Sequence, residues 1–441
     1  MRIRISVIAA MLFAASPFLF AQKPAFVTAK DGRLQVNGKP YYFIGTNYWY
    51  GSLLGLEKDP KRGIERLRRE LDFLKANGIT NLRLLGGAEG SGPLNGVTRV
   101  GPPFQVTQAS FNERALDGLD LLLDEMAKRD MRAVIFISNN WEWSGGFQQY
   151  LIWNKVISDE WLKKKPTWDE LRDLVAKFYT CAPCKTGYAR QAERLVGRIN
   201  TVNGKRYKDD PTIMAWQIAN EPRPMRPSAI EAYKQWIAET ARQFKTIAPD
   251  QLVSIGHEGW VGSEGMEVYE QIHADPNVDY LTIHIWPKNW AWFANGRMAE
   301  EYGKFRGETV KYIIDHAAVA RKLKKPLVIE EFGLPRDGQS FDPSSTTKIR
   351  DRYYSEVLSF VRKNPDIAGA NFWAFGGNVR PADLWWKPGN EYVGDPPMEE
   401  QGLYSVFAYD RSTWNIIRNA AKKKARGVST TGPTVQGAIK H

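Results

Sequence analysis

The feature that most constrains the fold of this chain is the repeated alternation of a short apolar segment with an amphipathic segment. The apolar segments have the length of β-strands, and the run MRAVIFI at 131–137 is almost continuously hydrophobic. The intervening segments place apolar residues three and four positions apart, which is the period of an α-helix. We predict strands at 42–45, 79–85, 131–137, 213–218, 252–255, 280–285, 327–329 and 368–372. We predict helices at 63–77, 111–129, 168–179, 188–199, 228–247, 266–273, 307–323, 346–362 and 412–424.

This alternation favours an α/β fold, and within it a single (β/α)8 TIM barrel. Strands that are apolar throughout are typical of parallel strands buried on both faces. One barrel can accommodate a chain of this length if its βα loops are enlarged. A doubly wound open sheet, the competing fold, usually has a glycine-rich phosphate turn after an early strand, and this sequence has none. We therefore predict one barrel domain over 22–426 that begins with a short β-hairpin at 26–42, where Asp31-Gly32 and Asn37-Gly38 are turn pairs.

The two ends of the chain differ from the barrel region in composition. Arg2 and Arg4 precede an almost uninterrupted apolar stretch at 5–20, and the small residue Ala21 follows it. This pattern is typical of a signal peptide, here at 1–21, so we expect a secreted or periplasmic protein. The alternative is an uncleaved membrane anchor, although the stretch is short for a membrane span. Residues 427–441 are small and polar, and we predict a flexible tail.

The charge of the chain excludes little and suggests no special partner. Lys and Arg number 61 against 49 Asp and Glu, which gives a net charge of +12. Many basic residues, such as Arg62, Arg66 and Arg69, lie in helix-like segments, where charge runs usually form solvated faces. The sequence carries no nucleic-acid motif. We therefore expect no nucleic-acid partner and, after signal cleavage, no membrane partner.

The two cysteines, Cys181 and Cys184, are spaced C-x-x-C. Such a pair can be a redox motif or half of a zinc site. There is no second pair, however, and the nearest histidine is His257, so a zinc site would lack ligands. In an exported protein we expect a small disulfide that holds a loop.

Polar and aromatic residues follow almost every predicted strand, at the end of the barrel where active sites of this fold lie. They stand after the second to eighth strands in turn: Arg83; Asn139, Asn140 and Trp141; Asn220, Glu221 and Arg223; His257, Glu258 and Trp260; His284 and Trp286; Glu330 and Glu331; and Trp373. A barrel with only a structural role would not need this concentration of polar side chains.

The carboxylates after the fourth and seventh strands suggest acid–base chemistry across the mouth of the barrel. Hydrolysis of a glycosidic bond needs one protonated carboxyl for the leaving oxygen and one ionised carboxylate that attacks carbon or activates water. Two carboxyls in one pocket repel each other when both are charged, so one of them keeps its proton. Of Glu330 and Glu331, at most one faces the pocket, because neighbouring strand side chains point to opposite faces. This chemistry implies no cofactor, and the sequence has no cluster of metal ligands.

Two short motifs add a family resemblance that extends over about 42–375. The segment Asn220-Glu221-Pro222 resembles the Asn-Glu-Pro motif of glycoside hydrolase family 5, and Glu331-Phe332-Gly333 is similar to its nucleophile motif. The resemblance implies that Glu221 is the acid/base and Glu331 the nucleophile. The finer similarity is to the β-1,4-mannanases of that family, in 45–49, 139–141 and 256–259, and in Arg223, which in mannanases helps to hold the leaving-side sugar.

We also predict roles for the other residues at the strand ends. Arg83 is expected to hydrogen-bond the nucleophile, and Asn220 to donate to the sugar 2-OH. His257 and His284 are expected to orient carboxylates or to contact hydroxyls. The remaining predicted substrate contacts are Trp373 as a floor under the sugar, Trp49, Trp141 and Trp286 along the cleft, Asn140, and more weakly Trp385 and Trp386 in the loop 376–401.

One residue departs from the family pattern. Many members have His-x-Tyr after the sixth strand, whereas this chain has His284-Ile285-Trp286. An indole N–H donates a hydrogen bond but cannot accept one. The departure leaves the acid–base scheme intact and bears on how the substrate is recognised.

Together these features predict a retaining endo-β-1,4-mannanase that acts on mannan, glucomannan or galactomannan. The alternatives are an endo-β-1,4-glucanase or an exo-β-mannosidase with the same machinery, a carbohydrate-binding barrel that does not hydrolyse, and transglycosylation through the same intermediate. The sequence leaves the oligomeric state open.

Overall fold

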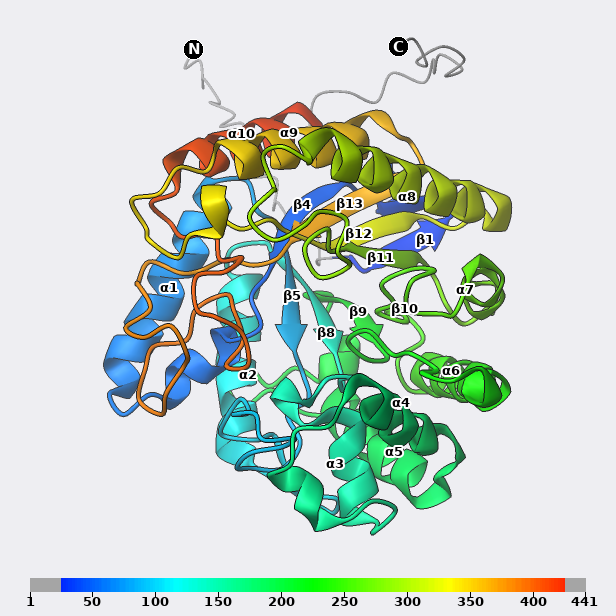
Figure 1. Cartoon of the computed structure of the whole chain (residues 1–441). Helices are drawn as coiled ribbons and strands as arrows, with labels where there is room; N and C mark the ends of the chain where they lie inside the picture. The colour runs from blue at the N-terminus through cyan, green and yellow to red at the C-terminus, as the bar shows by residue number, and fades with distance from the viewer. Residues whose placement is uncertain (1–24, 425–441) are drawn as a thin grey trace, which may run out of the picture.

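A parallel eight-stranded sheet forms the centre of the molecule (Figure 1). The computed structural model describes residues 25–424. Neighbouring strands follow the order β10-β9-β8-β5-β4-β13-β12-β11. Their bounds are β4 Phe43–Asn47, β5 Asn81–Leu85, β8 Arg132–Phe136, β9 Ile213–Gln217, β10 Leu252–Ser254, β11 Leu281–Ile285, β12 Leu327–Phe332 and β13 Ile367–Phe372. These are the eight predicted strands, with ends displaced by a few residues.

The two end strands of this order, β10 and β11, complete the barrel. The amide of Asp279 donates to the carbonyl of Val253 at 2.8 Å, and the amide of His284 donates to the carbonyl of Glu258 at 3.0 Å. All eight strands are buried along their whole length. This burial explains their apolar sequences, and the predicted (β/α)8 barrel is confirmed.

Helices surround the sheet (Figure 1). They are α1 Pro60–Ala76, α2 Glu113–Ala127, α3 Gly146–Trp153, α4 Trp168–Ala176, α5 Ala182–Val196, α6 Ile230–Ile247, α7 Met266–His273, α8 Tyr302–Leu323, α9 Lys348–Lys363 and α10 Arg411–Lys424. Short 3-10 helices span Gly51–Leu56, Glu142–Ser144, Asp159–Leu162, Lys177–Thr180, Tyr207–Asp209, Pro227–Ala229 and Asp337–Gln339.

Local signals explain where several helices begin. The side chain of Asp59 caps α1 by accepting a hydrogen bond from the amide of Arg62, and Thr167 and Glu170 form a capping box at α4. The helix α3 was not predicted, because its eight residues are mostly buried and show little helical period. The prediction also began α5 six residues late: Cys181 is its N-cap, and the predicted Cys181–Cys184 disulfide is present at this helix start rather than in a loop.

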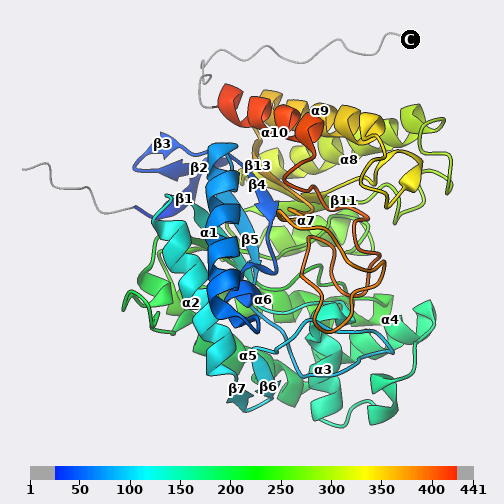
Figure 2. The same cartoon turned by 90° about the vertical axis from the view of Figure 1, so that its left-hand side faces the viewer.

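The N-terminal segment covers the end of the barrel opposite the carboxyl ends of its strands. It forms an antiparallel sheet of β1 Val27–Lys30, β2 Arg33–Val36 and β3 Lys39–Pro40, so the predicted hairpin gains a third short strand. Val27 and Leu34 pack with Phe43 and Val328 in one apolar cluster. In Figure 2 this sheet and the orange loop 376–401 lie on opposite sides of the molecule. A further small hairpin, β6 Gln105–Thr107 with β7 Ser110–Phe111, lies in the loop after β5.

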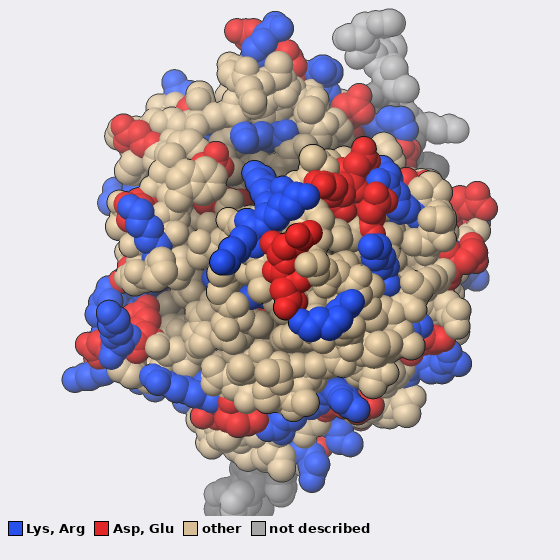
Figure 3. Space-filling view, turned by 60° about the horizontal axis from the view of Figure 1, so that its bottom comes forward, with Lys and Arg blue, Asp and Glu red and all other residues tan. Residues whose placement is uncertain are grey.

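The predicted signal peptide at 1–21 and the predicted tail at 427–441 lie outside the described residues, so both stay predictions. Among the helices of residues 25–424, none has the length and apolar character to cross a membrane. Basic and acidic side chains are intermixed on the face that Figure 3 shows. Of the basic residues expected to form a solvated face on α1, Arg62 and Arg69 are exposed, whereas Arg66 is buried and donates a hydrogen bond to Glu70, so the expectation is wrong for Arg66.

Candidate active site

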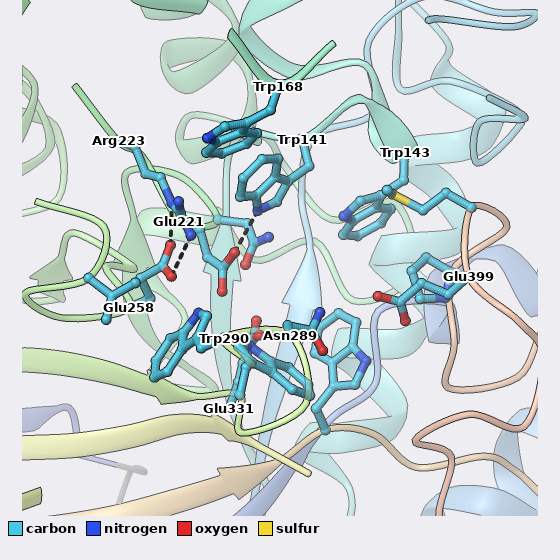
Figure 4. A pocket seen from close by; sticks show the side chains of 16 residues that line it. Trp141, Trp143, Trp168, Glu221, Arg223, Glu258, Asn289, Trp290, Glu331 and Glu399 are labelled. Carbon is cyan, nitrogen blue, oxygen red and sulfur yellow. Dashed lines mark hydrogen bonds and ion pairs between the residues drawn. The ribbon is translucent and has the colours of Figure 1, made fainter. Parts of the chain in front are cut away.

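A cavity of about 430 Å³ opens at the carboxyl ends of the barrel strands, where the polar residues were predicted to gather. Carboxylates and indole rings dominate its wall (Figure 4). The carboxylates are those of Glu221, Glu258, Glu331 and Glu399, and the indoles are those of Trp141, Trp143, Trp168, Trp286, Trp290 and Trp373. Flat apolar faces beside a few convergent polar groups suit a sugar ring, which has both C–H faces and hydroxyls.

Glu221 enters the cavity from a sharp turn directly after β9. Its φ of 50° lies in the left-handed region, which is strained for a residue with a side chain. Two backbone hydrogen bonds hold the turn: the amide of Glu221 donates to Gly256 at 2.9 Å, and that of Asn220 to Ser138 at 2.8 Å. The neighbouring strands therefore fix the direction of the carboxylate.

Glu331, and not Glu330, lines the cavity. Glu330 points into the barrel, where its Oε2 accepts a hydrogen bond from Gln217 at 2.5 Å and its Oε1 accepts one from the Tyr280 hydroxyl at 3.3 Å. Burial raises the pKa of Glu330. The structure thus decides the question that strand alternation left open, in favour of Glu331.

Arg83 lies beneath the cavity and holds the Glu331 carboxylate. Its Nη1 donates to Glu331 Oε1, as predicted, and its Nη2 donates to Asn220 Oδ1 at 2.8 Å. Its Nε donates to Gln217 at 2.7 Å, and the guanidinium lies over the ring of Phe136. Arg83 is fully buried, so its charge acts on Glu331 with little screening by water.

His284 joins the two glutamates from below. Its Nδ1 lies 2.5 Å from Glu221 Oε1 and 3.2 Å from Glu331 Oε2. Burial lowers the pKa of His284, but the charge of Glu331 and the hydrogen bonds to both carboxylates raise it to about 9. Burial raises the pKa of Glu221, but the hydrogen bond and charge of His284 outweigh that effect and hold the pKa at about 2. These two pKa values place a proton on His284 and leave Glu221 ionised at neutral pH.

The ligand atoms of Glu221, His284 and Glu331 all lie within 4.8 Å of one another. In the described part of the chain this is the one group of three such side chains that could reach a single metal ion. Because His284 Nδ1 hydrogen-bonds Glu221, the same distances fit a shared proton.

A second charged pair, Arg223 with Glu258, lies beside Glu221 (Figure 4). The guanidinium donates Nε to Oε2 and Nη2 to Oε1, both at 2.7 Å, in a bidentate contact. The guanidinium also lies over the rings of Trp141 and Trp168. The sequence analysis noted Glu258 after its strand but gave it no role. Burial raises its pKa to about 7, although the charge of Arg223 opposes this.

Trp141, Trp286 and Trp373 line the cavity as predicted. The indole of Trp141 donates to Glu221 Oε2 at 2.5 Å. For Nε1 of Trp373, residues 25–424 offer no hydrogen-bond partner. Asn220 also lines the cavity. Its side-chain Nδ2 donates one hydrogen to Asn139 Oδ1 at 3.1 Å, and the second hydrogen on Nδ2 is left for a ligand.

Three predicted substrate contacts do not reach this cavity. Trp49 is buried behind Trp143, where its indole donates to the carbonyl of Gly394 at 2.8 Å. His257 is fully buried, accepts from the Gly259 amide, and packs against Tyr269. Asn140 lies behind Arg223, and its Oδ1 accepts a hydrogen bond from the backbone amide of Arg223 at 3.3 Å. In all three cases the strand end was assigned correctly, but the side chain points into the protein.

The long loop 376–401 after β13 contributes residues that the sequence analysis missed. Pro396, Met398 and Glu399 line the cavity, whereas Trp385 is exposed and Trp386 stacks on Tyr392, and neither of these two tryptophans lines it. Burial raises the pKa of Glu399 well above its ordinary value, and the charge of Asp395 adds to this effect.

Three further lining residues, Trp143, Trp168 and Trp290, also escaped prediction. Trp143 lies in the 3-10 helix Glu142–Ser144, Trp168 begins α4, and Trp290 lies in the loop after β11, so all three stand beyond the strand ends. Their residue type was the one available signal.

The chain is similar to known glycoside hydrolases over nearly its whole length. The sequence model of a family described as GH family 5 beta-mannosidase-like matches residues 24–428. Mannan endo-1,4-beta-mannosidase 1 of Oryza sativa subsp. japonica is 27% identical over 370 residues, covering 79% of this chain and 78% of the relative. Mannan endo-1,4-beta-mannosidase 1 of Arabidopsis thaliana is 27% identical over 368 residues, covering 80% of this chain and 82% of the relative.

Solved structures give the same picture. A glycoside hydrolase family 5 mannosidase from Rhizomucor miehei superposes with a TM-score of 0.81 at 33% identity, covering 91% of this chain and 98% of the other. An endo-1,4-beta-mannanase from the same organism superposes with a TM-score of 0.68 at 23% identity, covering 91% of this chain and 100% of the other. The second similarity speaks for the fold alone.

Proposed function

The chain belongs to the β-mannosidase-like family within glycoside hydrolase family 5, and on that premise we propose that it hydrolyses β-1,4-mannosidic bonds with retention of configuration. The observation that carries the proposal is the convergence of Glu221 and Glu331 on one cavity, with carboxylate oxygens within 4.8 Å of each other. Carboxyl groups about 5–5.5 Å apart suit a double displacement, whereas inverting enzymes hold them about 6.5–9.5 Å apart to admit a water.

In the proposed first step, Glu331 attacks the anomeric carbon while the bond to the leaving oxygen breaks, and Glu221 gives that oxygen a proton. Arg83 donates a hydrogen bond to Glu331 and orients its carboxylate for this attack. In the second step, Glu221 takes a proton from water, the water oxygen bonds to the anomeric carbon, and Glu331 is released. Both glutamates then return to their starting states.

The shared proton explains how a glutamate with a low pKa can serve as the acid. In the unliganded site the proton lies on His284, 2.5 Å from Glu221. Moving it along this hydrogen bond leaves a neutral His284 and a protonated Glu221 without changing the total charge. We infer that the approach of the leaving oxygen favours this second arrangement, because a protonated carboxyl can donate to it.

We infer that the cavity holds a single mannose unit on the non-leaving side of the bond. In Figure 4, Trp143 and Glu399 lie on one side of Glu221, and Arg223 and Glu258 lie on the other. The loop that carries Glu399 thus borders the cavity opposite to the proposed leaving side. This border favours removal of mannose from the non-reducing end, in contrast to the endo action predicted from the sequence. The curated plant relatives, named as endo-acting mannosidases, favour the endo mode, which stays a second candidate.

The catalytic assignment is tested by a pair of neighbouring substitutions. Glu331→Gln removes the nucleophile and is expected to lower kcat on mannotriose by at least about 10⁴-fold, since this side chain forms the covalent bond. Glu330→Gln is the matched control, because it changes the adjacent buried carboxyl that faces away from the cavity. We expect it to retain most of the activity. Equal losses in both variants would remove Glu331 from its role.

The mode of action is tested by sizing products from mannohexaose early in the reaction. Exo action gives mannose and mannopentaose first, and endo action gives products of intermediate size first. Carboxymethylcellulose in a parallel reaction tests the glucanase alternative. Early mannobiose and mannotetraose without mannose would contradict the exo mode and favour the endo candidate.

A further inference from the structure

A second cavity, of about 250 Å³, lies outside the active-site cavity. The loop after β10 provides Trp260, the loop after β11 provides Trp292, and α8 provides Tyr312 together with Glu308, Lys311 and Asp315. None of these six side chains takes part in the proposed reaction.

The aromatic part of this cavity is accessible to a ligand. Trp260 is 41% exposed, although an indole of this size is usually buried. Its ring packs on Tyr312 at a centroid distance of 5.9 Å, and Trp292 packs on the same Tyr312 at 5.9 Å. Tyr312 is buried, so it fixes both indoles. Two supported aromatic rings at the surface offer apolar faces on which the C–H face of a sugar can stack.

The polar part of the cavity suits hydroxyl groups. Glu308, Lys311 and Asp315 belong to one side of α8, and Lys311 forms an ion pair with Asp315. Carboxylates accept hydrogen bonds from hydroxyls, and an ammonium donates to them. Lys311 and Asp315 offset each other's charge, and Glu308 leaves the three groups with a net charge of −1, which disfavours an anion and is compatible with an uncharged sugar.

The second cavity shares part of its wall with the active-site cavity. Val261 and Trp290 line the active-site cavity, next to Trp260 and two residues before Trp292. The ring of Trp290 packs against Trp292 at 5.1 Å and against Tyr312 at 5.2 Å. Glu258, which holds Arg223, belongs to the same loop as Trp260. The two cavities therefore adjoin on the proposed leaving side.

We propose that the cavity at Trp260 and Trp292 is a distal sugar-binding site for the part of a β-1,4-mannan chain that extends beyond the leaving group. The inference rests on the proposed function, because that function sets the ligand class. A distal site adds binding energy only when the substrate is long enough to reach both cavities at once. The enzyme should therefore prefer long mannan chains to short ones, with Trp260 as the source of part of that preference.

The test compares short and long substrates in one variant. Trp260→Ala is expected to lower kcat/KM for mannohexaose by about five-fold, the loss of one aromatic contact, and to change kcat/KM for mannobiose by less than about two-fold. Trp260→Phe keeps a ring and should retain most of the preference. Phe341→Ala is the control, because Phe341 is similarly exposed at 38% but lies after β12 and does not line this cavity.

Two outcomes would overturn the inference. Equal losses on mannobiose and mannohexaose would mean that Trp260 acts on the active site or on folding. Unchanged kinetics on both would mean that it binds no sugar. A binding measurement separates these results from failure of the proposed function: in native gels that contain soluble glucomannan, the Glu331→Gln protein should be retarded, and less so when Trp260→Ala is added. If the parent hydrolyses no mannan, the proposed function fails. If the Glu331→Gln protein and its Trp260→Ala double variant are retarded equally, the distal site is refuted whether or not the proposed function holds.

Discussion

At the scale of single residues, the environment of each carboxylate decides its chemistry. Glu330 and Glu331 are neighbours, yet one is held inside the barrel by Gln217 and the other meets Arg83 at the cavity. His284 adds a third titrating group and holds the proton that Glu221 needs. In the proposed reaction, Glu331 and Glu221 take different roles because different partners surround their carboxylates.

The shared proton predicts a pH effect in a His284→Asn variant. The pKa of His284 is raised to about 9, so the proton is present below that pH and is lost above it. The basic limb of kcat/KM in the parent should lie near pH 9. Without the imidazole, Glu221 must hold the proton alone, and the basic limb should move down by more than about one pH unit, with kcat about 10²-fold lower.

This effect is checked by pH profiles on mannotriose between pH 4 and 10. His257→Asn is the matched control, because His257 is equally buried at the same end of the barrel, but its Nδ1 accepts from the Gly259 amide whereas that of His284 bonds Glu221. Its basic limb should stay in place. A His284→Asn profile that coincides with the parent profile would show that His284 does not hold the proton.

At the scale of elements, the turn after β9 is the demanding part of the site. It holds Glu221 at a φ of 50° and relies on the neighbouring loop, where Gly256 accepts the Glu221 amide. A Cβ on Gly256 would lie 2.0 Å from the carbonyl oxygen of Ala219, and its φ is 82°. Glycine is required there by both the close approach and the backbone conformation.

We therefore expect Gly256→Ala to be strongly destabilising. The clash and the backbone strain together should lower the free energy of unfolding by about 3 kcal/mol, measured by urea denaturation. Gly204→Ala is the control, since Gly204 has a φ of 73° but no atom within 4 Å of the added Cβ. It should cost only about 1 kcal/mol. Similar losses in the two variants would show that the close approach at Gly256 contributes nothing.

At the scale of the whole molecule, buried groups that titrate outside the active site set the acid stability. His316 belongs to α8 and faces the loop after β10, where its Nε2 accepts from the Trp260 amide at 3.0 Å. Burial lowers its pKa from 6.5 to about 4. As the pH falls, the unfolded chain therefore takes up this proton before the folded protein does. The stability that neutral His316 contributes above pH 6.5 is lost as the pH falls to about 4.

A His316→Gln variant should reveal this contribution. The difference in free energy of unfolding, variant minus parent, should increase by about 2 kcal/mol when the pH is lowered from 7.5 to 4.5, because glutamine does not take up a proton. The comparison between variants is needed because Glu89 and Glu258, with pKa values raised to about 7 by burial, act in the opposite direction in this range. A difference that is constant with pH would contradict the prediction. Urea denaturation at both pH values gives the measurement.

Much of the fold and part of the site could be predicted from the order of residues. The apolar runs of strand length and the amphipathic segments between them are local features, and the barrel follows because parallel strands need such crossovers. The strand ends brought Glu221, Glu331, Arg83, His284 and Trp373 together as expected, because parallel strands share one end of a barrel.

The tertiary structure decided which way the side chains at those ends point and what the loops add to them. Trp49 and His257 follow the correct strands but face inward, since the alternation of a strand no longer holds where the chain leaves the sheet. Glu399 and Trp290 reach the cavity through long loops, whose paths depend on packing against the rest of the molecule and not on a local period. The sequence by itself therefore determined the barrel and its reactive centre. The extent of the cleft, the position of its shared proton and the second aromatic cavity depend on contacts between residues far apart in the chain.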